Sequence, residues 1–270
     1  MRCPQADPVF LLPTVLTLEK DGKVAWIRLQ RPERGNRLTA SMVEDLSAFC
    51  AQLADDDTVA IVVVTGTDEV FCHGLEYEAS QEAGVSAQRI REAFGNLHAI
   101  EALAALTKPT IAAINGDALS VGLELALACD LRLSVDTARF ALPQVADGLL
   151  PFCGGTQRLP RIIGMAKALE LVLLGTTLDA HEAQRVGLVN EAIAPEAWAT
   201  RVDEVLVGLL GKGPIALRLG KEAVLKALDL TLDQGMRLEE DLYALLQTTQ
   251  DRAEGVQAFL QKRTPHFRGL

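Results

Sequence analysis

The chain has 270 residues and a mass of 29.1 kDa, with 49% hydrophobic and 23% charged positions, enough to bury one large core or a core with a small appendage. Its formal net charge of −10, with no basic stripe along the sequence, argues against nucleic acid as a partner. Aromatic residues make up only 4% of the chain, which also disfavours a surface that stacks on bases.

The five cysteines are an odd number and lack the paired spacing of a disulfide framework or a zinc site. We therefore expect buried free thiols in a reducing compartment and no bound metal. The longest early apolar stretch, 9–16, is interrupted by Pro13 and is far too short to span a membrane. No basic segment with a cleavage site precedes it. These features predict a soluble, cytoplasmic protein with no membrane partner.

The first half of the chain alternates predicted strands with predicted helices. Segments 14–20 and 23–30 form a predicted β-hairpin, because the Asp-Gly pair between them tolerates the positive φ angles of a tight turn. Thr39 is a candidate cap for the helix that follows it. Two apolar runs, 58–65 and 110–115, are typical of strands buried on both faces. The other expected elements are helices ending near 53 and covering 86–106 and 121–129, a strand at 130–135 and a loop at 66–75.

The order strand, helix, strand, helix, strand favours right-handed crossovers and a mainly parallel sheet, which is an α/β fold. After about residue 154 the pattern becomes helical almost throughout. Apolar side chains on the last helices, such as Met236 and Leu242, need a partner surface, and a subunit interface is one possibility. The expected helices are 154–164, 166–174, 180–186, 195–211, 214–230, 233–250 and 253–261.

Two glycine-containing segments, 70–75 and 115–122, come before predicted helices and offer unpaired backbone amides. Glycine lets a backbone approach a ligand closely, and the first amides of a helix have no partner within it. Two such segments can aim a pair of N–H donors at one oxygen atom, an arrangement called an oxyanion hole. Glycine is also common wherever a strand meets a helix, so spacing alone leaves an ordinary structural role open.

Several ordered motifs occur along the chain, namely RPERGNRLT (31–39), FCHGLE (71–76), INGDALSVGLELALACDLRL (114–133), FALPQVADGLLPFCGGTQRLPRIIG (140–164), LDAHEAQRVGLVNE (178–191) and DRAEGVQAFLQKRTPHF (251–267). Together they resemble the crotonase family, the enoyl-CoA hydratase/isomerase superfamily, over nearly the whole chain. The resemblance implies a spiral of ββα units with a helical C-terminal region that forms homotrimers, often paired into hexamers. It divides the chain into an N-terminal extension (1–13), a core (14–200) and an oligomerisation region (201–270).

Members of this family bind an acyl thioester, usually of coenzyme A, and stabilise the enolate at its carbonyl oxygen with two backbone amides. The resemblance assigns these donors to the amides of Leu75 and Val121, and a substrate-binding role to Phe71, Gly74 and Gly122 beside them. Prepositioned donors in a dry pocket help most when charge develops on the oxygen. Relatives have smaller side chains at both donor positions, so the acyl pocket is expected to be narrower here. Coenzyme A enters as part of the substrate, and no cofactor is expected.

Hydratases of this family use two glutamates, which activate a water at C3 of an enoyl thioester and deliver a proton at C2. Glu124 matches the first position, whereas Gln144 occupies the second. A carboxamide holds a water but does not exchange a proton near neutral pH, and a lost general acid/base commonly costs about 10²–10⁴ in rate. We therefore expect a weakened or non-standard hydratase. An isomerase, a decarboxylase and a catalytically silent thioester-binding protein remain alternatives.

The polar residues near these motifs carry further expectations. Glu124 stands between Leu123 and Leu125, which predicts a carboxylate in a buried or cleft position with a raised pKa, the alternative being a solvated helix residue. His73 replaces a small residue usual in relatives, so its imidazole either reaches the pocket or is a hydrogen-bonded loop histidine. Asp147 is a weaker candidate for a second carboxylate, since most such residues are exposed loop or capping acids.

The phosphates of coenzyme A need local cations in this acidic protein. The resemblance points to Arg31, Arg34 and Arg37 in the early loop, and to Lys262 in a C-terminal end that often reaches a neighbouring subunit. Each could equally be a solvated charge. Glu78 replaces a lysine common in relatives, which weakens the expected nucleotide site. An acyl carrier protein could therefore replace free coenzyme A as the thioester carrier.

Overall fold

The computed structural model describes residues 15–76 and 87–270, without the side chains of 87–94. The predicted N-terminal extension lies outside the described residues, as do Cys3 and Glu78.

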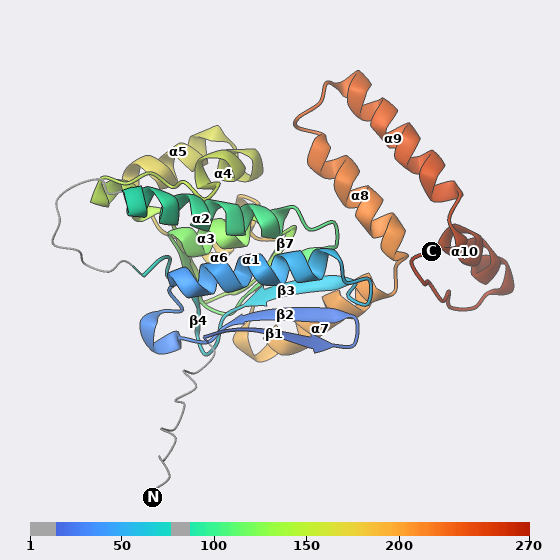
Figure 1. The fold of residues 1–270 in the computed structure, drawn as a ribbon, viewed down its shortest axis with the longest axis horizontal. Coiled ribbons are helices and arrows are strands. Elements are labelled where there is room, and N and C mark those ends of the chain that lie inside the picture. The colour runs from blue at the N-terminus through green and yellow to red at the C-terminus, as the bar shows by residue number, and fades with distance from the viewer. Residues whose placement is uncertain (1–14, 77–86) are drawn as a thin grey trace, which may run out of the picture.

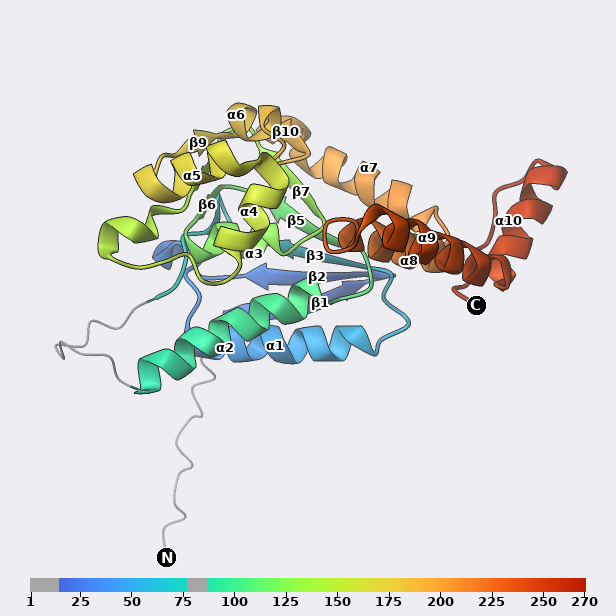
Figure 2. The ribbon, with the colours of Figure 1, turned by 90° about the horizontal axis from the view of Figure 1, so that it is seen from above.

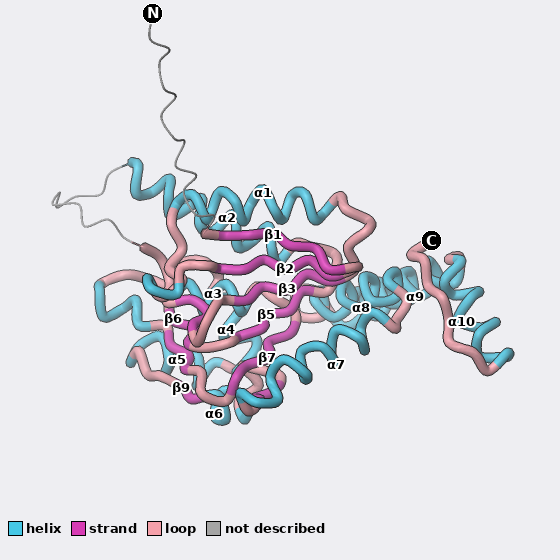
Figure 3. Tube along the Cα trace, turned by 90° about the horizontal axis from the view of Figure 1, so that it is seen from below, coloured by secondary structure: helices cyan, strands magenta, loops and turns pink. Residues whose placement is uncertain are grey.

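A six-stranded sheet lies at the centre of the molecule, with the strand order β1-β2-β3-β5-β7-β10 (Figure 3). Its first two strands form the predicted antiparallel hairpin, whose turn contains Gly22 at a φ of 58°. All the other pairings in this sheet are parallel, as expected from the alternation of strands and helices. The strands are β1 (Leu16–Asp21), β2 (Val24–Leu29), β3 (Ile61–Thr65), β5 (Thr110–Ile114), β7 (Leu131–Val135) and β10 (Glu191–Ile193).

A second sheet of four short strands was not predicted from the hydrophobic pattern. It contains β4 (Val70–Cys72), β6 (Asp117–Leu119), β8 (Arg139–Ala141) and β9 (Leu178–Asp179), in that order. The expectation of a loop over 66–75 was therefore wrong at β4, whereas the helices expected after residue 154 are present, with β9 and β10 as short strands between them. Strands of two or three residues carry too little alternation to be recognised, because pairing between distant segments specifies them.

Helices cover both faces of the six-stranded sheet (Figures 1 and 2). Their bounds are α1 (Ala40–Ala54), α2 (Ala87–Ala104), α3 (Val121–Leu127), α4 (Gly155–Ile163), α5 (Met165–Leu174), α6 (Ala180–Arg185) and α7 (Trp198–Leu210), with 3-10 turns η1 (Pro32–Arg34), η2 (Pro143–Asp147) and η3 (Pro195–Ala197). Residues of α1 to α6 share the main apolar core with one face of the sheet, and α7 packs in a smaller core on the other. Thr39 caps α1 as predicted, because its Oγ1 accepts a hydrogen bond from Met42 N.

Three further helices, α8 (Pro214–Lys226), α9 (Leu232–Gln247) and α10 (Gln250–Gln261), project away from this body (Figures 1 and 2). None of the residues of α8 and α9 is buried, and the exposed side chains include Val224, Leu232, Met236 and Phe259. The predicted helical C-terminal region is therefore present, with its apolar faces uncovered in the single chain. Among the described residues, no helix is both long and apolar enough to cross a membrane.

Lys221 connects α8 to the body of the protein. Its Nζ donates hydrogen bonds to the carbonyl oxygens of Leu106 and Lys108, and it forms an ion pair of 2.7 Å with Asp130. We expect Lys221→Met to lower the free energy of unfolding by about 1–3 kcal/mol, because the two carbonyls lose this donor and Asp130 loses its ion-pair partner. Thermal unfolding measures this change, and Lys226→Met on the exposed part of α8 is the matched control. Equal stability of the two variants would contradict the prediction.

Candidate active site

The two residues predicted to supply amide donors follow the carboxyl ends of two neighbouring strands of the small sheet. Strands β4 and β6 are parallel, with Cys72 opposite Ala118. Leu75 is three residues beyond Cys72, and Val121 is three residues beyond Ala118, so the register carries both to one end of the strand pair. Their preceding residues also touch, since a Cβ atom at position 74 would lie 2.9 Å from the Cβ of Ser120. The fold thus places the two segments against each other.

Both amides are available for a ligand. Val121 is the first residue of α3, so its N–H has no acceptor within the helix. The Leu38 N–H donates to the Gly74 carbonyl, and the Glu76 N–H donates to the Leu38 carbonyl. Because neighbouring amides of an extended segment point to opposite sides, the N–H of Leu75 faces away from Leu38. In the part of the chain that the structure describes, neither N–H donates to a protein acceptor. Ser120 precedes Val121 with a φ of 56°, a conformation that is unusual for a residue with a side chain.

Glu124 lies one helical turn after Val121 and is completely buried. Its Oε1 accepts hydrogen bonds from the backbone amides of Cys153 and Gly155, both at 2.8 Å, and its Oε2 accepts one from Gln144 Nε2 at 3.2 Å. These donors favour the charged carboxylate, but burial outweighs them and raises the pKa of Glu124 to about 7. The expected burial and raised pKa agree with the structure, and both protonation states are populated near neutral pH.

Gln144 lies in η2 beside Glu124 and is only 5% exposed. Its amide nitrogen is occupied by Glu124, but its Oε1 is buried without a hydrogen-bond partner among the described residues. The hydroxyl of Thr176 is the other buried side-chain atom in the described part of the chain that lacks a partner. The side chain at position 144 is therefore a neutral amide in contact with the Glu124 carboxylate.

The family model for enoyl-CoA hydratase/isomerase matches residues 19–269. The chain belongs to this family. A putative enoyl-CoA hydratase/isomerase of Bacillus subtilis is 38% identical to it, over 95% of this chain and 99% of the relative. The crotonyl-CoA hydratase of Syntrophomonas wolfei is 37% identical, over 93% of this chain and 97% of that protein. The crystal structure of an enoyl-CoA hydratase from Bacillus anthracis, 34% identical, matches with a TM-score of 0.89 and covers 95% of this chain and 100% of its own.

These comparisons confirm the crotonase resemblance and the α/β fold with C-terminal helices. They identify the chain as an acyl-CoA-processing enzyme of the enoyl-CoA hydratase/isomerase family.

Three weaker candidates from the sequence, His73, Asp147 and Phe71, differ in their surroundings. The ring of His73 packs on the early loop, where a Cβ atom at Gly35 would lie 2.6 Å from its Nδ1. Partial burial lowers the pKa of His73, and the charged groups that act on it are Asp117, Arg37 and Arg139. Asp147 is exposed at the end of η2, and Phe71 is completely buried in the main core. Neither His73 nor Asp147 hydrogen-bonds to Glu124, and the roles expected for all three residues stay predictions.

The predicted cations for coenzyme A fall into two separate places. Arg31 forms an ion pair of 2.7 Å with Glu76, and Arg37 donates a hydrogen bond to the His73 carbonyl, so both lie beside the first glycine segment. Arg34 is exposed in the same loop. Lys262 follows α10, which stands far from the body of its own chain (Figure 1).

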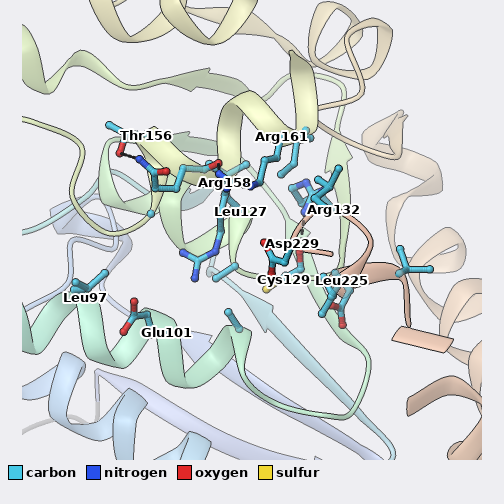
Figure 4. Close-up of a pocket in the computed structure, with 18 of the residues that line it drawn as sticks. Leu97, Glu101, Leu127, Cys129, Arg132, Thr156, Arg158, Arg161, Leu225 and Asp229 are labelled. Atoms are coloured by element: carbon cyan, nitrogen blue, oxygen red, sulfur yellow. Dashed lines mark hydrogen bonds between the residues drawn. The ribbon is translucent and has the colours of Figure 1, made fainter. Parts of the chain in front are cut away.

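A cavity of about 760 Å³ lies between α2, α4 and α8 (Figure 4). Gly154 lines it, and the backbone amides of the residues on either side, Cys153 and Gly155, donate to Glu124. Arg158 points into the cavity, and its Nη1 donates to the Cys153 carbonyl at 3.1 Å. Sequence reasoning missed these positioning groups, although a Cys-Gly-Gly run before a helix was the available signal.

Metal binding has no candidate in the described residues, because no group of three His, Cys, Asp or Glu side chains is placed to hold an ion. The four described cysteines, Cys50, Cys72, Cys129 and Cys153, are buried free thiols, as predicted. Burial raises the pKa of each of these thiols, to about 12 for Cys50.

Proposed function

We propose that the amides of Leu75 and Val121 hold the carbonyl oxygen of an acyl thioester while Glu124 moves the proton. The observation that carries this proposal is the buried Glu124 carboxylate, held by two backbone amides one helical turn from a free amide donor. Donors that are already oriented stabilise the oxygen as negative charge develops on it in the enolate. A carboxyl group with a pKa of about 7 exchanges protons readily near neutral pH.

Gln144 makes this enzyme a non-standard hydratase in our proposal. Its carboxamide contacts Glu124 but does not ionise, so a single carboxylate must serve where family hydratases use two. One carboxylate also suffices to move a proton between two carbons, or to protonate an enolate left by decarboxylation. Isomerisation and decarboxylation are therefore the alternative reactions of the same site, and a silent thioester-binding protein is the remaining alternative.

The reaction is tested with a panel of acyl-CoA thioesters and mass spectrometry of the products. Gain of one water identifies hydration, an unchanged mass with a moved double bond identifies isomerisation, and loss of carbon dioxide identifies decarboxylation. Binding without turnover of any thioester would contradict an enzymatic role.

The identity of residue 144 gives a separate prediction. Gln144→Glu should raise hydration of crotonyl-CoA by about a hundredfold or more, because it restores the second acid/base group. Steady-state kinetics at saturating substrate measures the gain. No gain in a folded variant would show that the missing carboxylate does not limit the rate, and would favour another reaction.

The carrier of the thioester is proposed to be coenzyme A, with its phosphates near Arg31, Arg34 and Arg37. The support is their common position in the early loop, next to the first glycine segment. An acyl carrier protein is the alternative carrier, and Lys262 of a neighbouring copy is a further candidate contact. Comparing the KM for a CoA thioester with that for the carrier-bound thioester separates the two.

We also propose a homotrimer or a hexamer in the cytoplasm. The projecting helices leave large apolar side chains uncovered, including Leu232, which is 80% exposed, and Phe259, which is 82% exposed. A second copy of the chain would cover these apolar helix faces in an oligomer. Light scattering after size-exclusion chromatography measures the number of copies in the oligomer. The support for a cytoplasmic location is the set of buried free thiols, which fit a reducing compartment.

A further inference from the structure

Two backbone amides separated by one residue hold the Glu124 carboxylate. The N–H groups of Cys153 and Gly155 both donate to its Oε1 at 2.8 Å, from the segment that leads into α4. Gly154 between them has a φ of 102°, in the left-handed region that favours glycine. The amides of such a turn converge on one anion, in a concavity called a nest. The position of Glu124 therefore depends on the shape of this three-residue segment.

Arg158, in the first turn of α4, bonds to the middle of the same segment. Its Nη1 donates to the Cys153 carbonyl at 3.1 Å, and its backbone N–H donates to the Gly154 carbonyl at 2.7 Å. The guanidinium lies close to the backbone here, because a Cβ atom at Gly154 would lie 2.0 Å from Nη1. The Cys153 carbonyl belongs to the peptide group between the two donating amides. Its bond to the guanidinium therefore limits the rotations that would turn those amides apart.

The positive charge of Arg158 also acts on Glu124. The guanidinium is half-buried and points from α4 into the cavity that α2 borders (Figure 4). It favours the ionised carboxylate and so lowers the pKa of Glu124, as do the hydrogen bonds to that carboxylate, although burial outweighs all of them. The groups whose charge acts on Arg158 in turn are Glu101, Glu124, Cys153 and Cys129. The carboxylate of Glu124 therefore has both a hydrogen-bonded nest and a cation beside it.

We propose that Arg158 is a positioning residue for Glu124. Its guanidinium fixes the Cys153 carbonyl, keeps the amides of Cys153 and Gly155 aimed at the carboxylate, and supplies a positive charge close to it. Arg158 acts through this segment and touches neither the acyl group nor the reacting atoms. The inference rests on the proposed function, because it takes Glu124 as the group that moves the proton.

Loss of the guanidinium should slow the chemical step and leave substrate binding unchanged. Arg158→Met removes the donors and the charge but keeps much of the apolar stem, and should lower kcat for crotonyl-CoA by about 10–100-fold with KM within about twofold. Steady-state kinetics on the full-length protein measures both constants. Arg161→Met is the matched control, because this exposed arginine of α4 lines the same cavity, and it should retain both constants. A higher KM at unchanged kcat would show that the guanidinium binds the substrate, and would overturn the inference.

The pH profile separates positioning of Glu124 from a contribution to stability alone. In the wild type, kcat/KM for crotonyl-CoA should fall on the acid side as Glu124 takes up a proton near pH 7. In Arg158→Met this fall should move to higher pH by about one unit, because the cation that favours the carboxylate is gone. Arg158→Lys keeps a positive charge without the planar fork, and should return the fall nearly to its wild-type pH while recovering part of kcat. An unmoved profile in Arg158→Met would overturn the inference.

A direct titration of Glu124 needs no turnover. The infrared band of its protonated carboxyl group is identified by its absence in Glu124→Gln, and the growth of this band with falling pH follows the protonation of Glu124. The midpoint should be about one pH unit higher in Arg158→Met than in the wild type, and unchanged in Arg161→Met. If Arg158→Met fails to fold, Arg158→Gln takes its place, because its neutral amide still offers a donor to the Cys153 carbonyl. Equal midpoints in the wild type and the neutral variant would overturn the inference.

The two proposals fail in different ways. Turnover that depends on Glu124, with a pH profile and a titration that do not respond to Arg158→Met, would overturn this inference and leave the proposed function in place. A titration that shifts in Arg158→Met, in a protein that turns over no acyl thioester, would overturn the proposed function and support the control of Glu124 by Arg158.

Discussion

Replacement of Glu124 by glutamine should lower the turnover of a 2-enoyl-CoA thioester by about 10²–10⁴, because Glu124 is the general acid/base group of the proposed reaction. The variant should fold, since the carboxamide has nearly the same shape and its oxygen still accepts from the amides of Cys153 and Gly155. Initial rates of product formation measure the effect. Glu196→Gln, at an exposed position in η3, is the matched control and should retain full activity.

The same substitution should change how stability depends on pH. Burial raises the pKa of Glu124 from 4.5 to about 7, so between these values the folded protein binds a proton that the unfolded chain has released. The stabilisation of the fold by this extra bound proton is fully present below pH 4.5 and is lost as the pH rises through 7. Glu124→Gln should remove that decline. Unfolding by denaturant at several pH values measures it, and identical pH dependence in both proteins would contradict the assigned pKa.

Gly122→Ala should lower activity by about 10²-fold or more, because it separates the two amide donors. A Cβ atom at this position would lie 2.0 Å from the Cys72 carbonyl oxygen, so α3 must move away from β4. Val121 lies at the start of α3, whereas Leu75 follows β4, and loss of one donor typically costs about 10²–10³ in rate. We also expect the free energy of unfolding to fall by about 1–3 kcal/mol from overpacking.

Gly220→Ala provides the control for the glycine substitution. Its Cβ atom would meet nothing within 4 Å on the exposed face of α8, so the variant should keep its activity and gain stability of about 0.5–1 kcal/mol. Circular dichroism should show both variants folded. Full activity in Gly122→Ala would rule out the pairing of these two segments as the oxyanion site.

Local chemistry made several elements predictable from the sequence. Asp-Gly specified the first hairpin, Thr39 specified the start of α1, and the apolar runs specified β3 and β5, because turn geometry, capping and strand burial depend on neighbouring residues. The buried state of Glu124 was equally evident from its apolar neighbours. Its hydrogen-bond partners were not, because Cys153 and Gly155 lie about thirty residues further along the chain.

The sequence by itself determined the family, the alternation of strands and helices, and the presence of glutamine where a hydratase has its second acid. Only the tertiary structure decided how these parts meet. The register of Cys72 with Ala118 brings the amides of Leu75 and Val121 to the same end of β4 and β6. The η2 turn places Gln144 against Glu124, with the Oε1 of Gln144 unpaired among the described residues. These contacts join segments far apart in the chain, and their geometry depends on packing rather than on local preference.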